Sequence, residues 1–420
     1  MLHTIIDNIS YSRTYFKEVK KLIMKKVYYA EANYSDEEIE AVISVLRDNR
    51  LALMGGKNVK ELEKQVAQIF NKEFGLMTNS GSSANLMAVQ ALNLKKGSKV
   101  ITPSLTFSTT VAPLVQSQLI PLFIDVERET MQIDVSLLKK IPLDGVSALC
   151  VPNLIGNIAN WQEIYHFAKE NNLKIIEDSA DTIGYQYSTD IKNWSDVSTT
   201  SFYASHVVTG AGFGGMTCFS DKEYYQNALS LRGWGRRSSL YGETEDIERR
   251  LSAKVDGINY DDKYIFDDMG YNFLPSEISA AFALVQLKNL KANIKNRIDN
   301  YNYIKDKLSA SNNFFVPTSY ENVETGWLAF PLILQNELAY KRKEIQIFLE
   351  NNGIQTRTIF TGNILRQPVA KKFKWASFGS FDISDNIMES GILLGCHNRQ
   401  TKEKMDYMLG KIFEIEKCLK

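Results

Sequence analysis

Apolar positions follow two alternating spacings from residue 74 onward. Short apolar runs predict strands over 74–78, 99–102, 121–126, 148–151 and 174–177. Helical spacing lies between them, most clearly over 81–92 and 161–171. Strands separated by helices predict βαβ units and an α/β fold with a mostly parallel sheet. Ligands collect at the carboxyl ends of such strands, so the residues after each strand are candidates for a site.

Amphipathic patterns flank this alternating region. A helix is predicted from an N-cap at Ser35 through residue 46, another over 58–70, and a long helix or helix pair over 276–305. The polar, charge-rich stretch 236–268 predicts an inserted loop. These boundaries divide the chain into an N-terminal helical extension (1–29), a large domain (30–305) and a smaller C-terminal α/β domain (306–420).

The composition narrows the class of protein. The 420 residues include 49 basic and 49 acidic side chains, a balance that favours neither nucleic acid nor an anionic membrane as partner. No apolar run approaches the roughly 18–20 residues of a membrane span, and the N-terminus lacks a signal-peptide core. Four scattered cysteines favour a reducing, cytoplasmic compartment, and four histidines without ligand spacing predict no metal site.

Two polar clusters follow predicted strands. Residues 79–85 (NSGSSAN) combine glycine and serines at a helix start, which fits either an anion site or a simple helix cap. Residues 177–181 (EDSAD) place Asp178 after a buried strand, where its carboxylate fits a protonated ring nitrogen or, again, a helix cap. Each cluster alone leaves both readings open.

A third cluster contains a histidine and several glycines. Residues 201–206 (SFYASH) precede the run 210–215 (GAGFGG), where glycines allow a backbone to approach a ligand closely. A lone histidine is more often structural than catalytic. Three such clusters at successive strand ends nevertheless indicate one shared site.

The order of these segments carries a family resemblance. TNSGSSAN, TPSLTFSTT, IIEDSADTIG, SFYASH and MGYNFLPSEISAAFALVQL together resemble the DegT/StrS aminotransferases, the sugar-modifying branch of fold-type I pyridoxal-phosphate enzymes. The resemblance runs from about residue 30 to the C-terminus. It implies an aspartate-aminotransferase-like fold whose large domain, 30–305, binds pyridoxal or pyridoxamine phosphate.

One substitution separates the chain from most members. Their SFY segment ends in the lysine that holds the cofactor as a Schiff base, and this chain has His206 there. Imidazole forms no stable Schiff base but can move protons near neutral pH. The same replacement marks the 3-dehydratases of nucleotide-linked 4-keto-6-deoxyhexoses, which use non-covalent pyridoxamine phosphate in deoxysugar and O-antigen synthesis. The resemblance therefore implies His206 as the catalytic base of such a dehydratase.

The resemblance also implies roles for the cofactor-facing residues. Gly81, Ser82 and Ser201 would hold the cofactor phosphate, and Phe107 would stack on the pyridine ring. Gly81, Ser82 and Phe107 follow predicted strands.

Further residues would contact the ring, a partner subunit or the substrate. Asp178 would pair with the ring nitrogen and Asp181 with the other polar edge of the ring. Asn272 would reach the phosphate of a neighbouring subunit, which implies a homodimer with shared active sites. Arg357 and Arg366 are candidates for the phosphates of the substrate, although exposed arginines are often only solvated.

The chain departs from part of this subgroup. Residues around 361–368 (TGNILRQP) most resemble the CDP-sugar members, whose loop after an RDWGR-like segment carries four cysteines for a [2Fe–2S] cluster. Here RGWGR is present, but 237–268 contains no cysteine, so we expect no iron–sulfur cluster. GDP-sugar members need none and use glutamate. The substrate is therefore expected to be CDP- or GDP-linked, with a reductase or glutamate as co-reactant.

Two other functions remain open at this point. One is a nucleotide-sugar aminotransferase that works without the usual lysine. The other is a non-catalytic relative that binds a cofactor or nucleotide sugar. Retention of the residues expected to hold the cofactor argues against the second.

Overall fold

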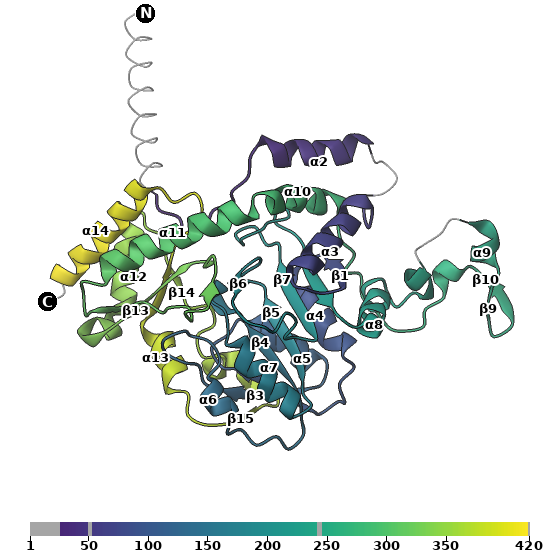
Figure 1. Cartoon of the computed structure of the whole chain (residues 1–420), viewed down its shortest axis with the longest axis horizontal. Coiled ribbons are helices and arrows are strands. Elements are labelled where there is room, and N and C mark those ends of the chain that lie inside the picture. The colour runs from purple at the N-terminus through teal and green to yellow at the C-terminus, as the bar shows by residue number, and fades with distance from the viewer. Residues whose placement is uncertain (1–25, 49–52, 242–245, 419–420) are drawn as a thin grey trace, which may run out of the picture.

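An eight-stranded sheet forms the centre of the chain (Figure 1). The computed structural model describes residues 26–48, 53–241 and 246–418. Across the sheet the order is β1 (Phe74–Thr78), β8 (Gly215–Phe219), β7 (Val197–Ser201), β5 (Lys174–Ser179), β4 (Val146–Pro152), β2 (Lys99–Pro103), β3 (Ile120–Ile124) and β15 (Ala376–Ser377). β8 runs antiparallel to both neighbours, and all other pairs are parallel. The predicted α/β fold with a mostly parallel sheet is confirmed.

The five predicted strands correspond to β1 to β5, and the apolar pattern did not reveal β7 and β8. β7 reads VSTTS, yet all five of its residues are buried. Its hydroxyls bond within the core: Thr199 Oγ1 donates to Asn85 Oδ1 (2.5 Å), and Ser198 Oγ donates to Glu177 Oε2 (2.8 Å). A polar strand can therefore be central when side chains from distant segments satisfy it.

Helices cover both faces of the sheet. Side chains along β4 alternate, so Ala148 and Cys150 join the core under α4 (Gly81–Ala91), while Leu149 and Val151 pack with Trp161 of α7 (Trp161–Glu170). The other helices of this region are α2 (Asp36–Asp48), α3 (Lys57–Ile69), α5 (Ser108–Gln116), α6 (Val135–Leu138), α8 (Lys222–Arg232), α10 (Glu277–Lys288) and α11 (Leu290–Leu308). Because the strands other than β8 run in the same direction, their carboxyl ends lie at one shared edge of the sheet.

A second, antiparallel sheet lies in the C-terminal part. Its order is β11 (Phe314–Phe315), β13 (Phe330–Leu334), β16 (Gly391–Leu394) and β14 (Arg357–Thr358), with α12 (Arg342–Asn351), α13 (Asp382–Ser390) and α14 (Lys402–Cys418) in the same region. α11 continues through the predicted boundary at 305, and β15 joins the central sheet from the C-terminal side. The proposed domain division remains a prediction, and most of the predicted N-terminal helix lies outside the described residues.

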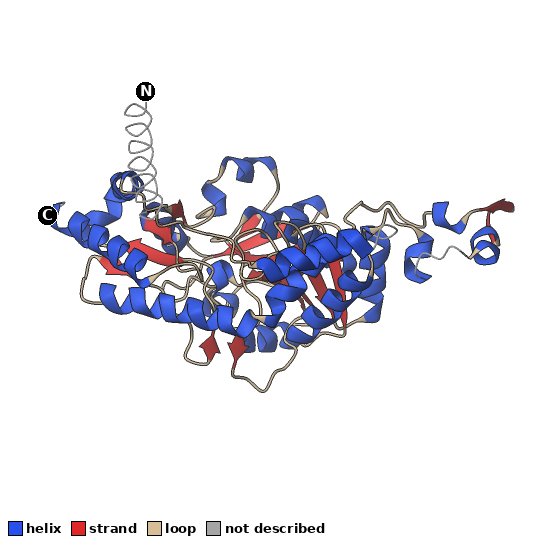
Figure 2. Cartoon of the chain, turned by 90° about the horizontal axis from the view of Figure 1, so that it is seen from above, coloured by secondary structure: helices blue, strands red, loops and turns tan. Residues whose placement is uncertain are grey.

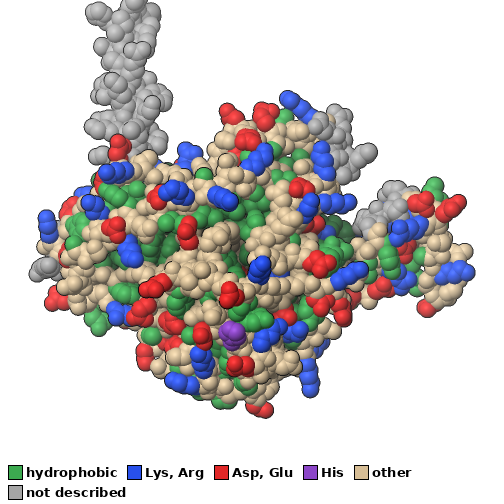
Figure 3. Space-filling view, in the orientation of Figure 1, with side chains coloured by type: hydrophobic (Ala, Val, Ile, Leu, Met, Phe, Trp, Pro, Cys, Tyr) green, Lys and Arg blue, Asp and Glu red, His purple; other side chains and the backbone are tan. Residues whose placement is uncertain are grey.

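The described residues of the predicted insertion 236–268, which are 236–241 and 246–268, belong to an arm that projects from the body (Figures 1 and 2). It contains α9 (Ile247–Leu251) and a two-stranded hairpin of β9 (Ala253–Val255) and β10 (Ile258–Tyr260). No helix in the described residues is long and apolar enough to cross a membrane. Positive and negative side chains are interspersed on the face drawn in Figure 3.

The buried carboxylate of Glu277, the first residue of α10, should stabilise the start of α3. It accepts hydrogen bonds from the backbone N–H groups of Asn58 (3.0 Å) and Val59 (2.8 Å), where α3 has no side-chain cap of its own. We expect Glu277→Ala to lower the free energy of unfolding by about 2–4 kcal/mol in urea denaturation. Glu277→Gln keeps an acceptor oxygen and should lose less. Equal stability of the alanine variant and the wild type would contradict this account.

Candidate active site

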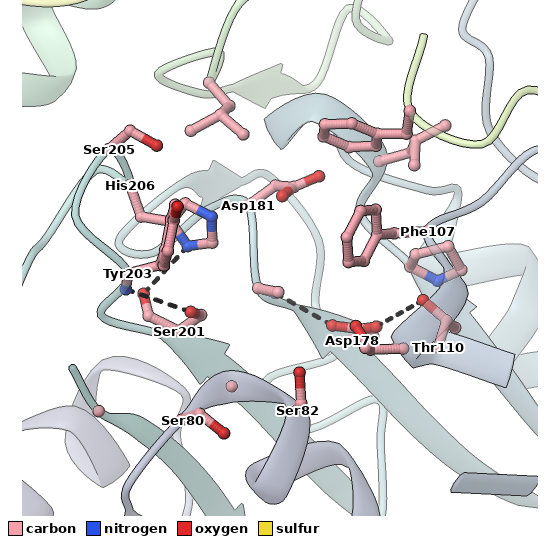
Figure 4. A pocket seen from close by; sticks show the side chains of 18 of the residues that line it. Ser80, Ser82, Phe107, Thr110, Asp178, Asp181, Ser201, Tyr203, Ser205 and His206 are labelled. Atoms are coloured by element: carbon pink, nitrogen blue, oxygen red, sulfur yellow. Dashed lines mark hydrogen bonds between the residues drawn. The ribbon is translucent and has the colours of Figure 1, made fainter. Parts of the chain in front are cut away.

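The N-terminus of α4 forms one wall of a cavity of about 580 Å³ at the carboxyl ends of the strands (Figure 4). Ser80 caps the helix by accepting from Ser83 N (3.1 Å), and Gly81 and Ser82 begin it. A Cβ on Gly81 would lie 2.5 Å from Ser201 Cβ, at the end of β7. The close approach of the start of α4 to the end of β7 therefore requires glycine. Backbone N–H groups and hydroxyls gathered at a helix N-terminus favour a bound anion.

A buried carboxylate, Asp178 on β5, forms the floor. Its Oδ2 accepts from Asn85 Nδ2 (2.8 Å) and Thr110 Oγ1 (2.8 Å), and Oδ1 accepts from Ala180 N (3.1 Å). Burial raises the pKa of Asp178, and these hydrogen bonds oppose the rise. No arginine or lysine among the described residues forms an ion pair with it. The site can therefore accept a cationic group of a ligand against this carboxylate.

Aromatic rings narrow the cavity on another side. Phe107, at the start of α5, is 47% exposed and meets Phe360 edge to face, with ring centroids 5.5 Å apart. Tyr203 and His206 lie across the cavity from Phe107, with Asp181 between them in the view of Figure 4. This arrangement leaves a slot in which a flat heterocycle could lie against the Phe107 ring.

His206 and Asp181 are the titratable groups beside this slot. His206 Nδ1 lies 3.4 Å from the Ser201 carbonyl oxygen, and burial lowers the pKa of the imidazole to about 4. Asp181 Oδ2 accepts from Ile155 N (2.8 Å), and burial raises the pKa of this carboxyl to about 7. At neutral pH the imidazole is uncharged and can accept a proton, while Asp181 is close to its titration midpoint.

Seven of the ten predicted site residues line this one cavity: Gly81, Ser82, Phe107, Asp178, Asp181, Ser201 and His206. The other three do not. Asn272 pairs through its backbone with Gly233, and Arg366 is bound to Asp385 (2.5 Å) on the surface. Arg357 lies just outside, with its guanidinium carbon 5.5 Å from the ring centroid of Tyr29, a cavity residue. The roles suggested for these residues remain predictions.

Sequence reasoning missed several residues of the site. Thr110 and Asn85 hold Asp178, and they lie in the segments TPSLTFSTT and TNSGSSAN, in which the sequence indicates only other residues as site residues. Tyr29 and Leu328 enter the cavity from the N-terminal segment and the C-terminal part, where no motif marks them. Only the threonine and the asparagine could have been found, because a buried carboxylate requires nearby donors.

The donor set fits pyridoxal or pyridoxamine phosphate. A helix N-terminus with hydroxyls fits the phosphate, Phe107 fits one face of the ring, and Asp178 fits a protonated ring nitrogen. Within the described ranges, no three His, Cys, Asp or Glu side chains are grouped as metal ligands.

Comparison with known proteins identifies the family. Residues 33–413 match the DegT/DnrJ/EryC1/StrS aminotransferase family. This chain belongs to that family. The resemblance and the fold expected from the sequence are thereby confirmed, and the family is one of pyridoxal-phosphate-dependent enzymes that modify sugars.

Individual relatives share most of their length with the chain. The lipopolysaccharide biosynthesis protein RfbH of Salmonella typhimurium is 31% identical, covering 90% of this chain and 89% of its own. The GDP-4-keto-6-deoxy-D-mannose 3-dehydratase of Escherichia coli O55:H7 is also 31% identical, covering 90% and 97%. A solved structure of GDP-4-keto-6-deoxymannose 3-dehydratase with a trapped PLP–glutamate geminal diamine has a TM-score of 0.82 at 28% identity, covering 92% and 99%.

An aminotransferase is also among the relatives. The GDP-perosamine synthase of Escherichia coli O157:H7 is 25% identical and covers 84% of this chain and 92% of its own. Both reactions therefore occur on similar chains.

Replacing the glycine at the phosphate wall should weaken cofactor binding. In Gly81→Ala the added methyl would meet Ser201, so α4 and β7 must separate. We expect the dissociation constant of pyridoxal phosphate to rise at least tenfold in spectroscopic titration. Gly410→Ala, in α14 with open space around the new methyl, is the matched control and should bind normally. Equal affinity in both variants would argue against this wall as the phosphate site.

The titration of His206 offers a second test. Its pKa of about 4 lies below the ordinary value of about 6.5, so between these values the unfolded chain binds more protons than the folded one. This group therefore destabilises the fold progressively as pH falls through that window. We expect an imidazole NMR resonance, identified by its loss in His206→Asn, that does not shift between pH 5.5 and 8. A midpoint near 6.5 would disprove the buried neutral state.

Proposed function

We propose that the chain is a pyridoxamine-phosphate-dependent 3-dehydratase that removes the C3 hydroxyl of a nucleotide-linked 4-keto-6-deoxyhexose. The observation that carries this proposal is the imidazole of His206 in the cavity. None of the described residues that line the cavity is a lysine. A proton-transfer group without a tethering amine fits dehydration better than ordinary transamination. The two 3-dehydratase comparisons support the same reaction.

The cofactor would be held without a covalent bond. Gly81, Ser82 and Ser201 would bind its phosphate, and Phe107 would fix the plane of its ring. When bound, pyridoxamine phosphate supplies an amine for the keto carbon and a conjugated ring that accepts electrons. Asp178 would hold a proton on the ring nitrogen, which strengthens that electron demand.

His206 would move the proton that dehydration requires. A hydrogen on Nδ1 facing the Ser201 carbonyl leaves Nε2 as the acceptor. Burial keeps the imidazole neutral, so the base needs no prior deprotonation at neutral pH. Asp181, fixed by Ile155 N, would contact the polar edge of the ring on the same side.

The setting and partners extend the proposal. The substrate would be GDP- or CDP-linked, with Arg357 near its phosphates. The names of the two related 3-dehydratases specify a GDP-linked sugar. We infer a homodimer in which Asn272 reaches the partner's site, and a role in deoxysugar or O-antigen synthesis in the cytoplasm. The glutamate adduct of the related dehydratase favours glutamate over a reductase as co-reactant.

An aminotransferase is the second candidate, favoured by the similarity to GDP-perosamine synthase. Product analysis separates the two reactions. With a 4-keto-6-deoxy nucleotide sugar and glutamate, a dehydratase yields a 3-deoxy sugar and an aminotransferase yields an amino sugar. A protein that binds cofactor but forms neither product would be the non-catalytic relative.

Cofactor linkage tests the central observation. We expect denaturation to release pyridoxamine or pyridoxal phosphate, with or without prior borohydride treatment, because the described residues that line the cavity include no lysine to tether it. Mass spectrometry of the protein and the supernatant measures this directly. Cofactor fixed to the chain by borohydride would reveal a Schiff-base lysine and refute the proposal.

Removal of the proposed base should separate binding from chemistry. We expect His206→Asn to lower the rate of C3 deoxygenation by at least 100-fold, a usual magnitude for a lost general base. Cofactor affinity should change less than threefold, because the phosphate wall and Asp178 are untouched. Mass spectrometric product analysis and cofactor titration provide the two readouts. Wild-type deoxygenation by the variant would remove His206 from the mechanism.

A further inference from the structure

The segment 26–33 carries Tyr29 into the active-site cavity. Val27 N donates to Gly353 O (2.9 Å), and Gln355 N donates to Val27 O (2.8 Å). Tyr29 N then donates to Gln355 Oε1 (3.1 Å). The backbone on both sides of the Tyr29 ring is therefore fixed to the C-terminal part of the chain.

The neighbouring peptide is also closely packed. The Tyr28 carbonyl oxygen accepts from His397 Nε2 (3.1 Å) and Gln400 Nε2 (3.2 Å). A Cβ on Gly395 would lie only 2.2 Å from this oxygen. The segment thus has little room to shift, and the position of Tyr29 is set in advance of any ligand.

The Tyr29 side chain ends in a hydroxyl that has no hydrogen-bond partner among the described residues. Arg357 covers the ring, with its guanidinium carbon 5.5 Å from the centroid. Among the described residues, no hydrogen bond to the Tyr29 hydroxyl is found, although this residue lines the cavity. Tyr29 is half-buried, and its hydroxyl is not among the fully buried atoms that lack a partner, so this group is available to donate a hydrogen bond to a ligand in the cavity that the residue lines.

The origin of Tyr29 indicates which ligand it faces. The residues that fit the cofactor follow β1, lie at the ends of β5 and β7 or directly precede α5, all at the carboxyl edge of the central sheet. Tyr29, Leu328 and Phe360 line the same cavity from the N-terminal segment and the C-terminal part. They consequently bound the space that remains beside the cofactor, where a sugar would lie.

The ionisation of Tyr29 limits its role. Burial and the nearby Asp181 carboxylate raise the pKa of its hydroxyl well above the usual value. The hydroxyl therefore keeps its proton and is a poor acid. It suits a permanent hydrogen-bond donor to a sugar oxygen.

We propose that Tyr29 is a substrate-binding residue whose hydroxyl donates a hydrogen bond to the hexose of a nucleotide-linked sugar. The inference rests on the proposed function and deepens it, because it assigns the sugar subsite to a residue outside the motifs. Arg357, stacked on the same ring, would place the diphosphate next to this subsite.

Binding measurements can separate the sugar from the nucleotide. The wild type, Tyr29→Phe and the matched control Tyr28→Phe, each loaded with pyridoxamine phosphate, are titrated calorimetrically with GDP-mannose and GDP, and with CDP-glucose and CDP. We expect Tyr29→Phe to weaken binding of the preferred nucleotide sugar three- to tenfold, as for one lost neutral hydrogen bond. Binding of the free nucleotide should not change. Tyr28 does not line the cavity, so its variant should match the wild type throughout.

The possible outcomes distinguish this inference from the proposed function. Unchanged sugar-nucleotide binding in Tyr29→Phe overturns the role of Tyr29 while leaving the dehydratase proposal intact. An equal loss for sugar nucleotide and free nucleotide also overturns it, because the hydroxyl would then act on the nucleotide or the fold. If the wild type binds neither nucleotide sugar, the proposed function fails and this inference fails with it.

Discussion

The burial of two adjacent carboxylates at the end of β5 constrains the rest of the structure. Glu177 and Asp178 point to opposite sides of the central sheet, as neighbours on a strand must. Six neutral side chains donate hydrogen bonds to Glu177: Asn153, Ser179, Tyr185, Trp194, Ser195 and Ser198. These hydrogen bonds fix the strand, and no ion pair to Glu177 forms within the described part of the chain. The hydrogen bonds of Glu177 thereby also fix the position of the neighbouring Asp178 at the floor of the cavity.

The environment of Asp178 differs from that of Glu177 because one of its carboxylate oxygens can accept a further hydrogen bond. Asn85 and Thr110 both bind Oδ2, which leaves Oδ1 with one backbone donor and capacity for another partner. A buried carboxylate with unused capacity is unfavourable unless a cation or a donor completes it. The remaining acceptor capacity of Asp178 favours a cationic ring at the floor of the cavity. The N-terminus of α4 favours an anionic group at its wall, so a ligand that carries both groups fits this cavity.

Burial also shifts the pKa values of three titratable side chains that line the cavity above Asp178. Burial lowers the pKa of His206 and raises those of Asp181 and Tyr29, so each side chain is moved toward its uncharged form. The three side chains differ in the proton transfer or hydrogen bonding that remains available to them. The imidazole can accept a proton, the carboxyl titrates near neutral pH, and the phenol keeps its proton and can donate a hydrogen bond. Desolvation by burial therefore leaves each of these three side chains with a different chemical role in the same cavity.

The sequence alone determined the elements that have a regular apolar period. The strands β1 to β5 were predictable as short apolar runs, which are buried on both faces of the sheet. The helices α4, α7, α10 and α11 were predictable from apolar residues at helical spacing. The buried polar strand β7 was not predictable in this way. Its hydroxyls are satisfied by residues far away in the chain.

For the site, the sequence supplied the residues that follow strands, since parallel strands bring their carboxyl ends together. Only the tertiary structure decided which further residues share the cavity. Tyr29 arrives from a segment anchored by contacts more than 300 residues away in sequence, including that with Gln355. Arg366 is instead drawn to Asp385 on the surface. The positions of these side chains depend on hydrogen bonds and ion pairs with residues distant in the sequence, and the local apolar pattern does not indicate which residues will pair.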